Sequence, residues 1–356
     1  MHKQSGYFYY KGLDSFRGIG ILWIICCHYF PGSNFFRFGW ISLEVFFVLS
    51  GFLITKVLLN SLNSPNFFRN FYIRRALKIF PLYYLFISLS FIVIFLFTKE
   101  KSSLYLKENF EYYYVYLHNF LFVFNGLEPE NYLNHLWSLA MEEQFYFLWP
   151  IIVFYIRDVS KLRKILIAIV ILVIIFRFIV WWNWGGRFEV YHCNTFTRID
   201  TIAFGCILGC GFSYKELNKY LRIFIILICA SVFPLAVIIY GNYFFTNPVF
   251  CTVGYTAISV LTVFLIEYFI SGEKNLLFLK NNWMLNYLGQ ISYGMYLFHI
   301  PVYFFISSRT MIQSPFNEIL SLLTSFVIAA ASYYFYETPF LKLKGKFSNN
   351  RLKTLN

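Results

Sequence analysis

Ten apolar segments, each about 20 residues long, follow one another along this chain of 356 residues. A helix needs about 20 apolar residues to cross the hydrocarbon layer, and in lipid only helices and closed barrels satisfy their backbone polar groups. The sequence therefore predicts an all-α integral membrane protein whose ten helices form one bundle. The segments cover residues 13–30, 41–60, 80–97, 136–156, 165–184, 198–213, 221–240, 248–270, 288–308 and 317–336.

Composition supports a membrane location and argues against a separate soluble catalytic domain. Hydrophobic residues make up 59% of the chain and charged residues 13%, about half the charged share of a soluble protein. The net charge of +13 does not indicate nucleic-acid binding, because the Lys and Arg residues lie in short runs between apolar segments and not on one polar face. We expect a cytoplasmic segment at residues 1–12, a membrane domain at 13–339 and a basic cytoplasmic tail at 340–356.

The basic residues also predict the orientation of the chain. With a cytoplasmic N-terminus, the inner segments hold about three times as many Lys and Arg residues as the outer ones, in agreement with the positive-inside rule. An extra span at residues 111–124 would place the later basic loops outside, so we expect that stretch to be interfacial or re-entrant. We do not expect a removable signal peptide before the first span. The prediction is a multi-pass protein of the inner (cytoplasmic) membrane with both termini in the cytoplasm.

The cysteines do not form a recognisable framework or metal site. Most of the seven lie inside apolar segments and are expected to be small buried hydrophobes. A disulfide between Cys193 and Cys251, both near the predicted outer face, is an alternative. No Cys/His spacing typical of a metal site occurs, so neither a metal nor a permanently bound cofactor is expected. The aromatic residues of the outer loop at 98–135 suit the interfacial belt, or alternatively a platform for stacking sugars.

Charged residues within the first span form one stripe. Arg17 and His28 are eleven residues apart, which is about three turns and about 16 Å along a helix axis. Asp14 precedes Arg17 by three residues and can pair with it. The stripe places charge at the inner end and a titratable imidazole near the outer end. A histidine that only hydrogen-bonds a neighbouring helix is the structural alternative for His28.

A basic run precedes the third span. Arg74, Arg75 and Lys78 lie just before Pro81, a residue that suits an early helical position. Arg75 and Lys78 would share a face if the helix has already begun. Such runs commonly set topology or bind anionic lipid headgroups. The functional interpretation is a cytoplasmic site for the phosphates of a coenzyme A thioester.

Three carboxylates enter the predicted membrane region from outside. Glu44 lies in the second span, and Glu142 and Glu143 lie in the fourth. Adjacent residues of a helix point about 100° apart, so at most one of the pair Glu142/Glu143 faces a given partner. For Glu142 and Glu143 the structural alternative is pairing with an arginine such as Arg177 or Arg198.

The remaining charged candidates lie at other depths. Arg198 and Asp200 start the sixth span from outside and can pair with each other. His299, about midway along the ninth span, is expected to make a structural hydrogen bond. Glu337 closes the tenth span near the basic cluster and is expected to be a salt-bridge partner.

Taken in order, these segments resemble the integral-membrane acyltransferase family 3, which includes polysaccharide O-acetylases. The resemblance extends from Leu13 to about Pro339. Each motif is weak by itself, and the ordered set is specific. The motifs are Arg17 with His28, the stretch FFVLSGFLIT, the basic segment at Arg74, Arg75, Lys78, Ile79 and Pro81, HLWSLAMEEQFYFLWP, Arg198-x-Asp200, SYGMYLFHIP and YETP.

The resemblance implies transfer of an acyl group, most often acetyl, from cytoplasmic acyl-CoA to a hydroxyl of a cell-envelope or exported glycan or lipid-linked saccharide. It implies that His28 is the key residue and that Arg17 and the Arg-x-x-basic pair contribute to the acyl-CoA site. Lys78 stands where the family commonly has arginine, and lysine loses the bidentate geometry. Some relatives carry an appended soluble hydrolase-like domain, which is not expected here.

The predicted mechanism places the phosphates of acetyl-CoA, a co-substrate, against Arg17, Arg74, Arg75 and Lys78, and the thioester near His28. Neutral His28 would accept the proton of the acceptor hydroxyl, or would carry the acyl group transiently. Glu142 or Glu143 would orient the imidazole. The alternatives are a transporter or flippase of a lipid-linked glycan, which makes no bond, and a scaffold subunit of an envelope-synthesis complex.

Overall fold

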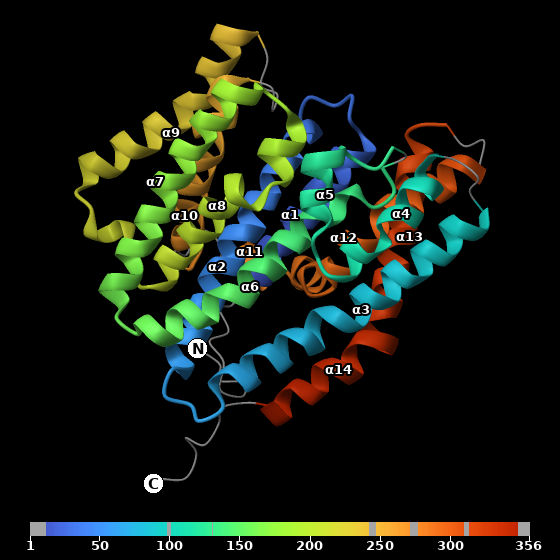
Figure 1. The fold of residues 1–356 in the computed structure, drawn as a ribbon, viewed down its shortest axis with the longest axis horizontal. Coiled ribbons are helices and arrows are strands. Elements are labelled where there is room, and N and C mark those ends of the chain that lie inside the picture. Colours follow the sequence, from blue (N-terminus) through green and yellow to red (C-terminus); the bar gives the residue numbers. More distant parts are fainter. Residues whose placement is uncertain are drawn as a thin grey trace.

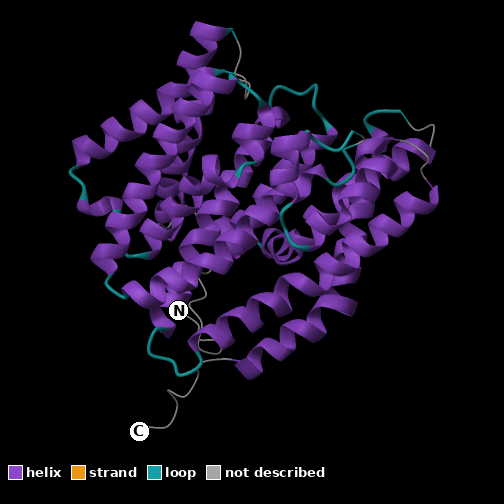
Figure 2. Cartoon of the chain, viewed as in Figure 1, coloured by secondary structure: helices purple, strands orange, loops and turns teal. Residues whose placement is uncertain are grey.

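The computed structural model describes residues 12–97, 101–129, 131–241, 247–270, 277–309 and 313–347, in which every regular element is a helix and no strand occurs (Figure 2). Short 3₁₀ and π segments extend or connect the α-helices. The α-helices are α1 (Leu13–Tyr29), α2 (Ile41–Ser61), α3 (Phe67–Phe97), α4 (Lys101–Tyr114), α5 (His118–Asn125), α6 (Trp137–Ile156), α7 (Val159–Trp184), α8 (Thr195–Gly209), α9 (Lys219–Tyr240), α10 (Tyr255–Ile270), α11 (Leu277–Asn281), α12 (Trp283–Arg309), α13 (Phe316–Ser332) and α14 (Thr338–Leu343).

The helices confirm the predicted class of an all-α integral membrane protein. Seven helices of the described part are long and apolar enough to cross a membrane. Of the ten predicted spans, those in α1 and α8 have only 17 and 15 residues, and α12 carries polar residues through its centre. The count of ten spans and the cytoplasmic location of both termini stay predictions. The stretch 111–124 is no continuous span, because it is divided between α4 and α5 at Tyr116, whose φ is 56°.

Local sequence signals set several helix ends. Asp158 caps α7: its carboxylate accepts hydrogen bonds from the backbone amides of Ser160 and Lys161. These amides, first that of Lys161, lower the pKa of the exposed Asp158 carboxyl. Asn194 and Asn218 cap α8 and α9 in the same way. These caps satisfy amides that have no partner inside the helix.

The third span begins earlier than the sequence predicts. Helix α3 starts at Phe67, so Pro81 lies in its interior and not in its first turn. The basic run is therefore already helical, and Arg75 and Lys78 share one face of α3. The expected early-helix position of Pro81 is wrong. The helix has begun before Arg75 and Lys78, which is the condition for these two residues to share a face.

Glycines bring α1 and α12 together as a parallel pair. A Cβ atom at Gly18 would collide with the backbone carbonyl of Leu285, and one at Gly289 would collide with that of Asp14. Small residues allow such close approach between membrane helices. The Ser15 hydroxyl donates to the Asn286 side chain at 2.9 Å, with a sequence separation of 271 residues. The same separation holds for Gly18 and Gly289, so the helices run parallel and in register.

A second pair, α2 and α8, uses the same packing. A Cβ atom at Gly51 would collide with the carbonyl of Ile202, and one at Gly205 with that of Val48. The separation of 154 residues between Gly51 and Gly205 recurs between Glu44 and Arg198, which form an ion pair. Spans one and nine, and likewise two and six, are parallel in the alternating order that the sequence predicts.

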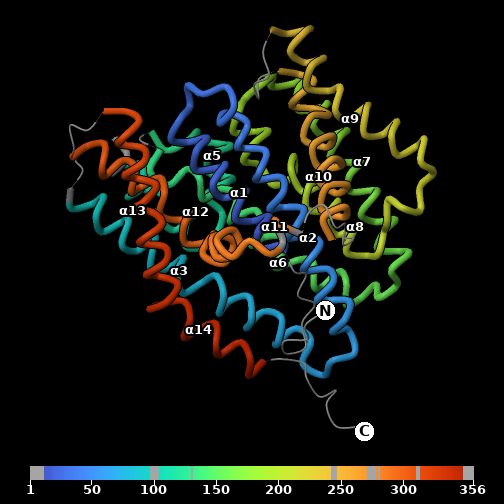
Figure 3. Tube along the Cα trace, turned by 180° about the vertical axis from the view of Figure 1, so that it is seen from behind, coloured from blue at the N-terminus to red at the C-terminus, as the bar shows by residue number. Residues whose placement is uncertain are grey.

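These pairs lie in the middle of the bundle (Figure 1). Helices α7, α9 and α10 lie on one side of α2 and α8, and α3 and α13 lie on the other side of α1 and α12, as the view from behind also shows (Figure 3). Helix α14 runs beside α3 in both views. The bundle therefore surrounds the short helices α1 and α8 with longer ones.

The predicted boundary of the tail, after residue 339, lies within α14. Residues 340–347 belong to α14 and η8 (Lys344–Phe347), and Leu341 and Lys344 line a cavity of the bundle. The division of the chain into these segments stays a prediction. The rest of the tail, 348–356, and residues 1–11 of the N-terminal segment lie outside the described residues. Cys193 and Cys251 are buried free thiols, so the alternative of a disulfide between them is wrong.

Candidate functional site

Two cavities meet inside the bundle. The first, here called the inner cavity, has a volume of about 300 Å³ and opens among α1, α3, α12 and α14. The second, the outer cavity, has a volume of about 820 Å³ and is lined by the C-terminal part of α1 and the middle of α12. Ile24, Leu43 and Tyr296 line both cavities. We call these three side chains the septum, because they are the wall that the two cavities share.

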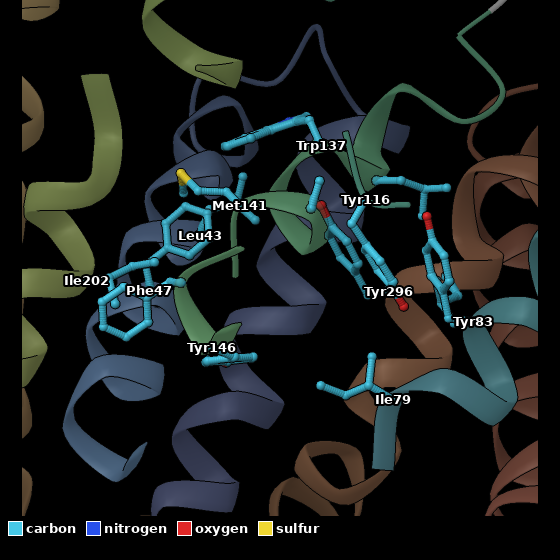
Figure 4. Packing of buried hydrophobic residues seen from close by; sticks show 14 of the residues in the cluster. Leu43, Phe47, Ile79, Tyr83, Tyr116, Trp137, Met141, Tyr146, Ile202 and Tyr296 are labelled. Atoms are coloured by element: carbon cyan, nitrogen blue, oxygen red, sulfur yellow. The ribbon is translucent and has the colours of Figure 1, made fainter. Parts of the chain in front are cut away.

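Figure 4 shows two members of the septum, Leu43 and Tyr296, in the packed core. In this view Trp137, which lines the outer cavity, is above their level, and Tyr146, which lines the inner cavity, is below it. Ile24 is 1% exposed, and Leu43 and Tyr296 are each 8% exposed. The Tyr296 hydroxyl is held by two contacts, at 2.6 Å to the carbonyl oxygen of His135 and at 2.8 Å to the Ser138 hydroxyl.

The inner cavity is basic. Arg17, Arg75, Lys78 and Lys344 line it, against the carboxylates of Asp14 and Glu142. The predicted pairing of Asp14 with Arg17 is confirmed, with 3.8 Å between the charged groups. Arg74 is not among the lining residues, so the structure does not bring it to this site. The excess of positive charge suits a ligand with several phosphate groups.

Two side chains hold Glu142 in the inner cavity. The Ser50 hydroxyl donates to its carboxylate at 2.8 Å, and the Tyr146 hydroxyl donates at 3.0 Å. The guanidinium of Arg75 lies over the Tyr146 ring, with its central carbon 4.0 Å from the ring centroid. Glu143 points away, into a separate cavity of about 590 Å³ between α3 and α6. Neither carboxylate lines the cavity of His28, so the expectation that one of them orients its imidazole is wrong.

The outer cavity contains His28. Although His28 lies within the bundle, its side chain is exposed to this cavity, whereas its partner His299 is fully buried. The surrounding wall mixes rings with hydrogen-bonding groups, a composition common in ligand sites. The polar members are Arg37, Glu128, Asn131, Asn134, His135, Glu189 and His192, and the aromatic ones include Trp40, Trp137 and Phe188.

The hydrogen bonds of His299 determine the tautomer of His28. His299 Nδ1 lies 2.7 Å from the carbonyl oxygen of Tyr296, which can only accept, so His299 donates there. In neutral His299 the other nitrogen, Nε2, then carries a lone pair. That atom lies 2.9 Å from Nδ1 of His28, which must therefore donate to it. Neutral His28 is left with a lone pair on Nε2, which has no hydrogen-bond partner among the described residues.

The lone pair on His28 Nε2 can accept a proton or attack an electrophile, and the polar group that orients His28 is a histidine on another helix. His28 and His299 have the same separation of 271 residues as the glycine contact, so the packing of α1 against α12 sets their distance. From the sequence we expect His299 to make a structural hydrogen bond. In the structure its partner in that bond is His28, the candidate base. The separation of 271 residues hides this pairing from any local pattern.

Four charged residues form two buried ion pairs and line neither of the two cavities. Arg198 pairs with Glu44, which also accepts a hydrogen bond at 2.9 Å from Thr201. Arg177 pairs with Asp200. All four side chains are fully buried. The expectation that Arg198 and Asp200 pair with each other is wrong, because each reaches a different neighbouring helix.

Several residues of the site were missed or misplaced from the sequence. Glu337 accepts a hydrogen bond from Ser332 at 3.4 Å, and it forms no ion pair at salt-bridge distance with a described residue. His135 and His192 both line the outer cavity, and neither drew attention as a site residue in the sequence. In the loop at 98–135, the residues that line this cavity are Leu127, Glu128, Pro129, Asn131, Asn134 and His135, and none of them is a Phe, Tyr or Trp. The sugar-stacking alternative for the aromatic residues of that loop therefore finds no support.

Several known proteins are similar to this chain in sequence. The sequence model of the Acyltransferase domain family 3 matches residues 10–336. A protein named YrhL from Bacillus subtilis is 30% identical over 95% of this chain and 56% of its own length. The O-acetyltransferase OatA of Staphylococcus aureus is 29% identical over 94% of the chain and 57% of its own length.

A third relative, the peptidoglycan O-acetyltransferase OatA of Listeria monocytogenes, is 28% identical over 94% of the chain and 56% of its own length. The chain therefore spans less than two thirds of the length of these relatives. No solved structure matches it at a significant level.

Proposed function

The chain belongs to the integral-membrane acyltransferase family 3, and on that premise we propose that it transfers an acetyl group from cytoplasmic acetyl-CoA to a hydroxyl group of a cell-wall glycan. The names of the two OatA relatives support the acetyl group, and the name of the Listeria protein specifies peptidoglycan. The observation that carries the proposal is the pair of cavities, one basic and one containing His28, on two sides of one thin wall.

The donor would bind in the inner cavity. The phosphates of CoA are polyanionic, and Arg17, Arg75, Lys78 and Lys344 supply the matching charge. Arginine pairs with phosphate through two parallel hydrogen bonds and lysine acts as a point charge. The pantetheine arm would extend from these residues toward the septum and bring the thioester within reach of His28.

The acceptor hydroxyl would bind in the outer cavity, next to the free Nε2 of His28. As the hydroxyl oxygen attacks the thioester carbonyl carbon, His28 Nε2 takes its proton and the C–O bond of the ester forms. The C–S bond then breaks, and the imidazolium returns the proton to the CoA thiolate, which leaves as the thiol. The reaction therefore needs no other reactant. His299 accepts from Nδ1 throughout and keeps the basic nitrogen directed at the cavity.

Labelled acetyl-CoA tests the proposal directly. Membranes that contain the full chain are mixed with labelled acetyl-CoA and isolated cell-wall glycan, and label in the glycan is measured by mass analysis after washing. Ester-linked label that is lost on mild alkaline treatment is the expected result. Movement of glycan across the membrane without label in it would replace the enzyme by the transporter or flippase alternative.

A further inference from the structure

We propose that the septum of Ile24, Leu43 and Tyr296 sets the length of the acyl group that this protein transfers. The inference rests on the proposed function and adds a specificity-determining element to it. The three residues come from three helices, α1, α2 and α12, and they are the residues common to both cavities. An acyl group that passes from a donor on one side to an acceptor on the other has to occupy this place.

The helical register puts the septum directly beside the histidine pair. Ile24 precedes His28 by four residues on α1, and Tyr296 precedes His299 by three residues on α12. Both spacings amount to about one turn, or about 5 Å along the axis. A thioester carbonyl carbon that reaches the acceptor near His28 Nε2 therefore has its acyl substituent at the level of the septum.

The septum leaves little room for a longer chain. Its side chains are almost fully buried, and the Tyr296 ring is fixed because its hydroxyl contacts both His135 and Ser138. Ile24 belongs to the main core cluster, in which neighbouring side chains fill the space around it. Extra methylene groups forced into a packed core displace their neighbours. A wall of this kind passes a short acyl group more readily than a long one.

The expected preference can be bounded. One methylene group in an apolar pocket changes the ratio of kcat/KM values by about 10- to 200-fold. The intact protein should therefore use acetyl-CoA about 10-fold or more better than propionyl-CoA. Replacing a branched septum residue by alanine opens space at the wall, and the preference should fall to within a few-fold of equality.

A competition experiment measures this ratio. Membranes with the full chain receive equal amounts of acetyl-CoA and propionyl-CoA with isolated cell-wall glycan, and mass analysis gives the ratio of the two esters. Because both products come from the same protein molecules, the ratio does not depend on how much of a variant folds. The test variants are Ile24→Ala and Leu43→Ala, and Ile24→Val serves if the alanine variants do not accumulate.

Two neighbouring residues provide matched controls. Ile25 and Leu49 are each 0% exposed and line neither cavity. Ile25→Ala and Leu49→Ala remove the same atoms from the same helices as the test variants, and they should keep the acetyl preference of the unsubstituted protein.

The outcomes separate the two proposals. A larger share of propionyl ester in the septum variants than in the controls supports the septum. The same ratio in all variants, or equal use of both donors by the unsubstituted protein, overturns the septum and leaves the proposed function standing. If the unsubstituted protein forms neither the acetyl ester nor the propionyl ester, the proposed function is overturned and this inference with it.

Discussion

The helix pairs α1/α12 and α2/α8 use one packing device for two different purposes. Each pair is parallel, each is brought together by glycines, and each keeps a constant sequence separation along its contact. The first pair carries His28 and His299, and the second carries Glu44 and Arg198. The difference is access: His28 is open to the outer cavity, whereas Glu44 and Arg198 are fully buried.

This comparison indicates that the role of a polar pair inside the membrane depends on whether a cavity lies beside it. Close helix packing holds both pairs in fixed geometry. The pair beside a cavity can meet a substrate, so its loss should reduce catalysis. The pair without a cavity can only satisfy its own charges, so its loss should reduce stability.

The largest effect is expected for His28→Ala. Removal of a general base lowers kcat by about 10²- to 10⁴-fold, while the melting temperature in detergent should change little, because the side chain is exposed to the cavity. Transfer of labelled acetyl to glycan gives the rate. Cys27→Ala, which changes the preceding residue in the same cavity, is the control and should stay close to full activity. Undiminished transfer by His28→Ala would remove this residue from the mechanism.

Arg198→Ala should act on stability instead. It leaves the carboxylate of Glu44 buried without its cation, which costs about 3–5 kcal/mol. Thermal unfolding in detergent should show a clear fall in melting temperature, whereas the exposed Arg187→Ala should not. The double variant Glu44→Leu/Arg198→Met should regain part of the loss, because it removes both charges together. If the Arg198→Ala protein is normally stable but impaired in transfer, the assignment of stability to the second helix pair is wrong.

His299→Ala should lower kcat while leaving KM for acetyl-CoA near its normal value. Without His299, Nδ1 of His28 has no fixed acceptor, and an unsatisfied buried hydrogen bond costs about 1–3 kcal/mol, or about 10- to 100-fold in rate. His299→Gln retains an acceptor oxygen and should recover part of the rate. Equal losses in both variants, with KM raised in step, would point to a structural role alone.

Arg75→Ala tests the inner cavity, away from the histidine pair. Loss of a hydrogen bond to a charged group weakens binding by about 1.5–3 kcal/mol, so KM for acetyl-CoA should rise by about 10- to 100-fold and KM for the acceptor should not. Arg74→Ala is the matched control, because Arg74 is the adjacent arginine and does not line the cavity. A larger effect on the acceptor than on acetyl-CoA would move the donor site elsewhere.

The smallest effect is expected for Lys344→Ala, because lysine contributes a single point charge at the edge of the inner cavity. KM for acetyl-CoA should rise by less than about tenfold and more steeply at low salt, where charges are screened least. Lys342→Ala, an exposed neighbour, should behave like the unsubstituted protein. Identical behaviour of the two variants would exclude Lys344 from the donor site.

The sequence alone determined the class of the protein and the inventory of its intramembrane charges. Apolar segments of bilayer length leave helices as the simplest choice, and the low charge content makes each buried ionisable residue conspicuous. It also placed Arg17 and His28 at two ends of one helix, because a helical period fixes residues within a single element. The basic segment at Arg75 and Lys78 followed from the same reasoning.

Only the tertiary structure decided which of these residues meet. Adjacent residues point about 100° apart, so the sequence could not tell Arg75 from Arg74, or Glu142 from Glu143, as the one that faces the inner cavity. It could not pair His28 with His299, or Glu44 with Arg198, because those contacts arise where glycine faces of distant helices pack in register. The period of a helix is a local property, whereas the contact between two helices depends on the shapes of both surfaces.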